Sequence, residues 1–109
     1  MTYNEVVERV REVFEYADAR NVFEHIAIQV NIIGDEACGI FYFEVAGRQI
    51  SVEPYDYYDR DGILTTTAAT LIDMCDDKIT IKEAYEKGLV KFEGDLKKFN
   101  ICLTNIIIK

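Results

Sequence analysis

The sequence predicts one α+β domain that spans residues 1–109, with a five-stranded sheet and helices that cover one of its faces. Three observations lead to this fold class. Apolar residues recur at helical spacing in the first segment, and they alternate with polar residues in the segments that follow. The chain then returns to helical spacing, which one more alternating segment interrupts. No repeat, low-complexity tract or linker divides this order, so we expect a single domain.

The N-terminal segment "MTYNEVVERVREVFEY" predicts an amphipathic helix that ends near Arg20–Asn21. Valines and Phe14 line one face, and Thr2 followed by Glu5 is the pattern of a capping box. The segments "HIAIQVNII", "IFYFEV" and "QISVEPY" then alternate between apolar and polar residues, and short turns join them. These three segments predict an antiparallel meander.

The second half of the chain predicts two further strands and three helices. "ILTTT" is a β-branched strand, and "AATLIDMC" is a short helix. "TIKEAYEKG" is a helix that ends at Gly88, a residue suited to the left-handed C-terminal position, and "LVKFEGD" is the last strand. A final helix follows. The expected N-terminal caps of these helices are Thr67 or Thr70, then Thr80 with Glu83, and then Asp95.

The charge of the chain argues against nucleic acid as a partner. The net charge is −8 and the pI about 4.6, so the surface repels phosphates and anionic lipid headgroups at long range. No apolar run reaches the ~20 residues that cross a membrane, and the charged N-terminus differs from a signal peptide. We expect a cytoplasmic protein without stable membrane insertion. The three cysteines are widely spaced and odd in number, which predicts buried, reduced thiols rather than a disulfide framework.

No residue pattern in the sequence indicates catalysis, a metal site or a cofactor. His25 is the only histidine, and Ser51, the only serine, falls on the outward face of a strand, which leaves no triad to assemble. The run "DYYDRDG" places three aspartates before Gly62, but in the register of a calcium loop Tyr57 and Ala68 would take the first and twelfth ligand positions. We therefore expect these aspartates to form a turn and the neighbouring tyrosines to pack their rings.

The segment "EAYEKGLVKFEGDLKKFNICL", Glu83 to Leu103, resembles the C-terminal part of the sterol carrier protein type 2 (SCP-2) family. That part consists of an aromatic helix, a strand closed by a glycine and an aspartate, and an amphipathic helix. "GILTTTAATLIDMCDDKIT" and the earlier meander fit the family's order as well, so the resemblance covers about the whole chain.

The resemblance implies a mixed sheet, in which crossover strands join the meander, and an apolar tunnel between the sheet and the helices. Members of the family bind fatty acids, fatty acyl-CoA, sterols or related lipids, and the domain is not itself an enzyme. The tunnel positions that the resemblance implies are Leu71, Met74, Tyr85, Val90, Phe92, Phe99 and Leu103. Tyr85 replaces the usual phenylalanine, and the ending "NIIIK" is no peroxisomal address, so the chain looks like a small stand-alone bacterial member.

We therefore expect a non-enzymatic carrier, without a cofactor, that holds a fatty acid, acyl-CoA or other apolar lipid in this tunnel. One alternative is an interaction or scaffold protein whose tunnel is closed by tyrosine and phenylalanine. Its partner would bind the outward Leu89 and the run Tyr55–Tyr58. Another alternative is an accessory protein of lipid or quinone metabolism that presents an apolar substrate to an enzyme. Both alternatives include a protein partner.

Overall fold

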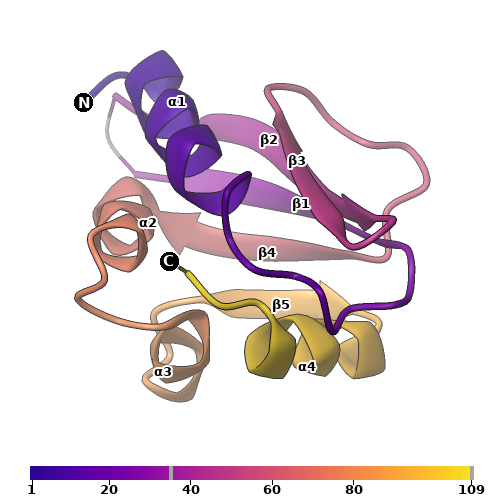
Figure 1. Cartoon of the computed structure of the whole chain (residues 1–109). Helices are drawn as coiled ribbons and strands as arrows, with labels where there is room; N and C mark the ends of the chain where they lie inside the picture. The colour runs from indigo at the N-terminus through magenta and orange to yellow at the C-terminus, as the bar shows by residue number, and fades with distance from the viewer. Residues whose placement is uncertain (35, 109) are drawn as a thin grey trace.

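The structure is a computed structural model that describes residues 1–34 and 36–108. It confirms the predicted five-stranded mixed sheet (Figure 1), whose strands lie in the order β3-β2-β1-β4-β5. The elements are α1 (Tyr3–Phe14), β1 (Ile26–Ile33), β2 (Gly39–Ala46), β3 (Gln49–Glu53), β4 (Gly62–Thr67), α2 (Ala68–Cys75), α3 (Ile81–Glu86), β5 (Lys91–Gly94) and α4 (Leu96–Asn105).

The central strand β1 organises the sheet, because it pairs with β2 in the antiparallel direction and with β4 in the parallel direction. The strands β2 and β3 complete the predicted meander, and β5 pairs antiparallel with β4 at the other edge. In the middle of the sheet Val30 pairs with Phe41 on one side and with Leu64 on the other, and all three side chains are buried. This row faces the helices and forms the floor of the core.

The predicted caps hold the helices in place. Thr2 and Thr80 each form a complete capping box, while Thr67 caps α2 and Asp95 caps α4 through their side-chain oxygens. Gly88 follows α3 with a φ of +75°, a left-handed conformation that glycine adopts without a steric penalty. The chain can therefore turn sharply from α3 toward β5.

The first helix is shorter than the sequence predicts, because it ends at Phe14 and not near Arg20–Asn21. The carboxylate of Glu15 accepts a hydrogen bond from the backbone N–H of Val52 in β3 at 2.9 Å. A little further on, Asp18 forms an antiparallel backbone bridge with Ile107. These tertiary hydrogen bonds draw residues 15–25 away from the helix axis and toward the start of β1.

Two of the three cysteines behave as expected and one does not. Cys75 and Cys102 are buried, and burial raises the pKa of the Cys75 thiol to about 11 and that of the Cys102 thiol to about 12. Both thiols therefore stay neutral and pack as small hydrophobic groups. The prediction is wrong for Cys38, which is exposed because it lies in the turn between β1 and β2.

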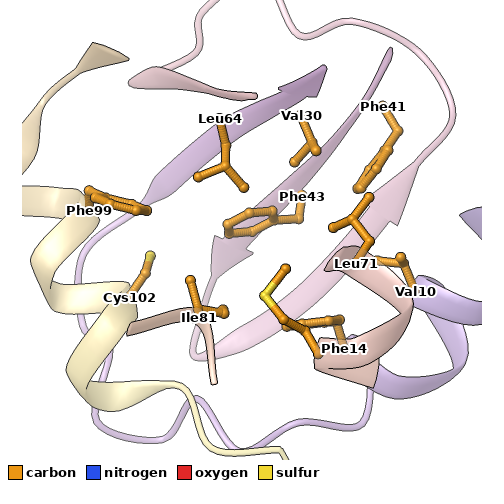
Figure 2. A pocket seen from close by; sticks show the side chains of 11 residues that line it. Val10, Phe14, Val30, Phe41, Phe43, Leu64, Leu71, Ile81, Phe99 and Cys102 are labelled. Carbon is orange, nitrogen blue, oxygen red and sulfur yellow. The ribbon is translucent and has the colours of Figure 1, made fainter. Parts of the chain in front are cut away.

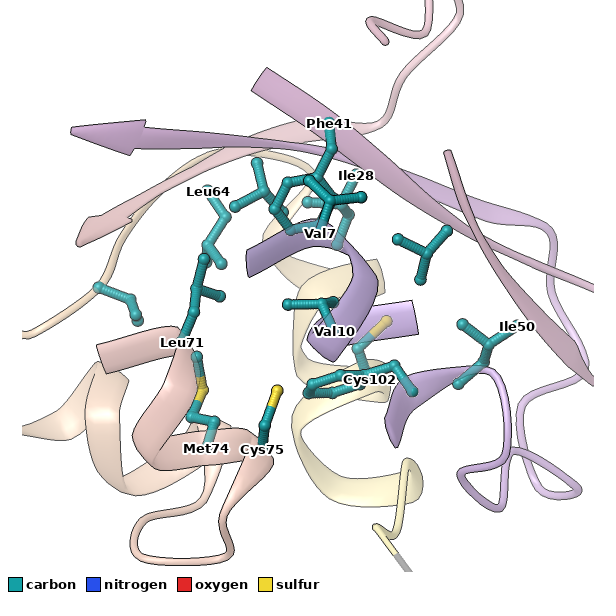
Figure 3. Packing of buried hydrophobic residues seen from close by; sticks show 14 of the residues in the cluster. Val7, Val10, Ile28, Phe41, Ile50, Leu64, Leu71, Met74, Cys75 and Cys102 are labelled. Atoms are coloured by element: carbon teal, nitrogen blue, oxygen red, sulfur yellow. The ribbon is translucent and has the colours of Figure 1, made fainter. Parts of the chain in front are cut away.

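The hydrophobic core lies between the sheet and the helices (Figure 3). Val7 and Val10 of α1 point toward the sheet residues Ile28 and Phe41. The neighbouring helix α2 adds Leu71, Met74 and Cys75 to the same core. Within the described residues, every helix is too short or too polar to cross a bilayer. The next question is whether this core leaves room for a ligand.

Candidate functional site

A small cavity lies in the hydrophobic core where α1, α2, α3 and α4 approach the sheet (Figure 2). Its wall consists only of apolar side chains, and Figure 2 shows them converging on one space. The lining residues are Val10, Phe14, Val30, Phe41, Phe43, Leu64, Leu71, Met74, Ile81, Phe99 and Cys102. With no charged or hydrogen-bonding group on its wall, this space can attract only apolar ligand atoms.

The volume of this cavity is about 30 Å³, enough for one or two water-sized spheres. A benzene-sized ligand occupies an apolar cavity of about 150 Å³ by the same kind of measure. An acyl chain therefore does not fit between the layers unless side chains or a helix move. The cavity in this structure is therefore too small for such a chain.

An aromatic cluster closes the cavity at its α3–β5–α4 end. Phe99 of α4 stacks face to face on Phe92 of β5, with ring centroids 4.1 Å apart, and Tyr85 of α3 meets Phe99 edge-on at 5.2 Å. Gly62 makes room for this arrangement, since a Cβ atom at that position would lie 2.2 Å from the Phe92 ring. The three rings link α3, β5 and α4 into one wall.

The seven predicted tunnel residues occupy four different places. Three of them line the cavity, namely Leu71, Met74 and Phe99. Tyr85 and Phe92 contact the ring of Phe99 in the aromatic cluster without lining the cavity, and Val90 is buried in the core. Leu103 lines a separate groove. Contact of these residues with a ligand stays a prediction.

The first helix and the meander supply wall residues that the resemblance did not assign. Val10 and Phe14 come from α1, and Phe41 and Phe43 come from β2. Their signal is present in the sequence, because helical spacing and strand alternation turn them all inward. Only the two matched segments, from Gly62 onward, led to named tunnel positions, and these four residues lie before them.

A second space, a groove with both apolar and polar side chains on its wall, lies beside the cavity, between the start of α3 and the C-terminal segment. Its volume is about 350 Å³, within the range of ligand sites. The lining residues are Asp77, Ile79, Thr80, Ile81, Lys82, Leu103, Thr104, Ile106, Ile107 and Ile108. Ile81, the first residue of α3, lines both the groove and the cavity, so the two spaces adjoin at this side chain.

One of the three aspartates in "DYYDRDG", Asp61, has a structural role. Its carboxylate accepts hydrogen bonds from the backbone N–H of Ala27 at 2.9 Å and from the Nζ of Lys98 at 2.8 Å, which ties α4 to β1. Burial raises the pKa of this carboxyl, but the Lys98 and Ala27 hydrogen bonds outweigh that effect and hold it below its usual value. Among residues 1–34 and 36–108, no three His, Cys, Asp or Glu side chains gather in a group that could hold a metal ion.

The sheet face opposite the helices carries a cluster of aromatic and polar side chains. Tyr57 stacks on Tyr42 with ring centroids 4.8 Å apart, and Tyr55 meets Tyr42 edge-on at 5.6 Å. His25 contacts the carboxylate of Glu44 at 2.5 Å. The predicted packing holds for Tyr55 and Tyr57, whereas Tyr58 is 98% exposed. This cluster lies across the sheet from the cavity and takes no part in it.

An apolar cavity enclosed by a five-stranded mixed sheet and a helical layer defines a small α+β domain suited to apolar ligands. The comparison with protein families then identifies the chain. It belongs to the SCP-2 sterol transfer family, whose model matches residues 4–100. This match confirms the resemblance in the sequence and assigns the chain to a family of lipid-binding domains.

Several solved structures share the fold. The palmitated SCP2L2 from Aedes aegypti is 17% identical with a TM-score of 0.69, and the alignment covers 95% of this chain and 93% of that chain. The UbiJ-SCP2 ubiquinone synthesis protein is 13% identical with a TM-score of 0.63, and the alignment covers 94% and 90% of the two chains. At such identities the likeness shows the fold alone.

The same fold also occurs as part of a much longer enzyme. The stereoselective inverting sec-alkylsulfatase Pisa1 from Pseudomonas sp. is 13% identical with a TM-score of 0.58, and the alignment covers 98% of this chain but only 14% of that chain. This chain thus spans a small part of the sulfatase's length. A comparison with curated proteins finds no match.

Proposed function

We propose that the protein is a non-enzymatic lipid carrier that accepts one apolar chain of a fatty acid, acyl-CoA or related lipid between its sheet and its helices. The observation that carries this proposal is the purely apolar wall of the interlayer cavity in a chain of the SCP-2 sterol transfer family. The adjacent groove, which shares the wall residue Ile81 with the cavity, provides the second half of the space. The three cysteines, all within the described residues, form no disulfide, and free thiols are typical of proteins in a reducing compartment such as the cytoplasm.

The element that moves most easily to admit a lipid is α3. It has six residues, too few to be stable on its own, and Ala84 is its only buried residue. Its first residue, Ile81, stands between the groove and the cavity, and Gly88 follows its end in a left-handed turn. A small outward shift of α3 would join the two spaces into one tunnel.

The energies favour such an opening. Separating Tyr85 from Phe99 costs about 0.5–1.5 kcal/mol beyond the loss of buried area. Burying about twelve to sixteen CH₂ groups of an acyl chain yields about 10–13 kcal/mol. Association itself costs several kcal/mol, at least about 4. At this minimum cost about 4.5–8.5 kcal/mol remains, so the longer acyl chains reach binding in the micromolar range.

Lipid binding is tested by native mass spectrometry of the chain purified from cells, followed by displacement of a fluorescent fatty acid with palmitate. We expect one lipid per chain and competitive displacement. Phe43→Ala, which removes a ring from the cavity wall, should strengthen binding of long chains. Phe23→Ala is the matched control, because Phe23 is 75% exposed and lies outside the wall, and it should change nothing. A chain that is purified without lipid and does not bind the fluorescent fatty acid would refute the proposal.

The small cavity also favours a second candidate function. A site that stays closed would make the protein an accessory factor, and the UbiJ-SCP2 ubiquinone synthesis protein shares this fold. Such a factor would bind an enzyme of lipid or quinone metabolism rather than a free lipid. Stable co-purification with one protein partner, together with no uptake of the fluorescent fatty acid, would favour this function over the carrier.

A further inference from the structure

The charge of the molecule is divided between its two ends. Residues 1–77 hold five arginines and 16 acidic residues, a net charge of −11, whereas residues 78–109 hold seven lysines and four acidic residues, a net charge of +3. The second segment builds α3, β5 and α4, which lie together at the β5 edge of the sheet (Figure 1). We call the part formed by residues 78–108 the lysine end; without Lys109 it holds six lysines and four acidic residues, a net charge of +2.

The lysines of this end are available to a partner. Of the six that the structure describes, only Lys98 forms an ion pair, with Asp61. Two of the four acidic residues already serve the fold, because the carboxylates of Glu83 and Asp95 accept backbone N–H groups at the starts of α3 and α4. The other five described lysines therefore keep ammonium groups that form no ion pair within the described residues.

Exposed apolar side chains accompany these lysines. Leu89 is 46% exposed, and Leu96 and Ile107 are each 55% exposed. Ile107 also lines the groove beside α3, so that groove belongs to the lysine end. Exposed leucine and isoleucine among lysines form the composition of segments that lie on an anionic membrane surface.

We propose that the lysine end docks on a bilayer that contains anionic lipids, with the −11 end turned toward the solvent. The net charge of −8 repels such a surface in most orientations, but the separation of charge gives the molecule one orientation that is attracted. Docking would bring the groove to the lipid surface. This inference does not depend on the carrier function, because a domain with a closed cavity could dock in the same way.

The test is sedimentation of the full chain with vesicles of phosphatidylcholine alone or with added phosphatidylglycerol, in 50 mM and 500 mM NaCl. We expect binding to the anionic vesicles only, and its loss at high salt. Lys82→Glu with Lys97→Glu should weaken this binding at least about 25-fold, since each lysine near an anionic surface contributes about fivefold. Both positions lie in the first turn of a helix, where glutamate is favourable, so the fold should persist.

The matched control is Arg48→Glu with Arg60→Glu, which changes the net charge equally at exposed positions outside the lysine end. It should leave vesicle binding within about twofold. Equal loss in both double variants would show that net charge alone matters and would overturn the proposal. Equal binding to neutral and anionic vesicles, or none to either, would overturn it as well. Uptake of the fluorescent fatty acid in solution, measured on the same variants, reports on the carrier function separately.

Discussion

Removing the ring of Tyr85 should make the interlayer site easier to open. Tyr85 is the aromatic side chain that α3 places against Phe99, at a centroid distance of 5.2 Å and an interplanar angle of 81°. Ala84 is the only buried residue of α3, so this ring contact is a large share of what holds the helix against α4. Tyr85→Ala removes the contact and leaves the cavity wall itself unchanged, since Tyr85 does not line the cavity.

The size of the effect follows from the aromatic contact. An edge-to-face pair contributes about 0.5–1.5 kcal/mol, so its loss raises the open population about two- to twelvefold. When the open form is a minor population, the apparent affinity rises by the same factor, because the apparent dissociation constant is the intrinsic one divided by the open fraction. We expect lipid binding about fivefold tighter and faster, with a loss of about 1–2 kcal/mol in the free energy of unfolding.

Titration and stopped-flow mixing with a fluorescent fatty acid measure both quantities. Tyr85→Phe is the matched control, because it keeps the ring against Phe99 and should behave like the wild type. If Tyr85→Ala destabilises the domain but leaves both the affinity and the association rate unchanged, α3 is not the element that opens, and the reasoning fails.

Three further predictions concern Gly62 beside the aromatic cluster, the Asp61 carboxylate and the groove lined by Leu103. Gly62→Ala should lower the free energy of unfolding by about 1–3 kcal/mol in a denaturant titration, because the new Cβ would collide with the Phe92 ring, and the cost should shrink in a Phe92→Ala background. A cost that is the same in both backgrounds would contradict this explanation. The stabilisation from Asp61, whose folded-state pKa is lowered, is present above its ordinary value of 3.8 and is lost as the pH falls through the lower, folded-state value. The melting-temperature difference between wild type and Asp61→Asn should therefore narrow below that pH, and a constant difference would exclude this role for the carboxylate. Leu103→Trp should reduce fatty-acid uptake by filling the groove while the domain stays folded, and full uptake by a folded variant would show that the groove is not part of the route.

Local signals in the sequence predicted much of the fold. The capping boxes at Thr2 and Thr80 and the glycine at position 88 depend on a few neighbouring residues, so their sequence patterns are sufficient. Strand alternation likewise identified the inward faces of β1 and β2. The mixed character of the sheet required the family resemblance, because the parallel pairing of β1 with β4 joins residues that are far apart in the chain.

Features that depend on distant contacts could not be predicted in this way. The end of α1 is set by Glu15 bonding to β3 and by the bridge between Asp18 and Ile107, and helical periodicity contains neither interaction. The volume of the cavity is equally hidden, because alternation says which side chains point inward but not how closely they pack. For the same reason, alternation and spacing could not show that Leu103 lines the neighbouring groove and not the cavity, and its contact with a ligand stays a prediction.

The central claim is that an acyl chain enters the space between the sheet and the helices. Isotope-filtered NMR with ¹³C-labelled palmitate tests it most directly, because it records contacts between the methylene groups of the ligand and individual side chains. We predict contacts to Leu71 and Met74 on the cavity wall and to Ile81 at its boundary with the groove. Contacts confined to exposed residues such as Leu89 and Leu96, or no contacts at all, would contradict the account.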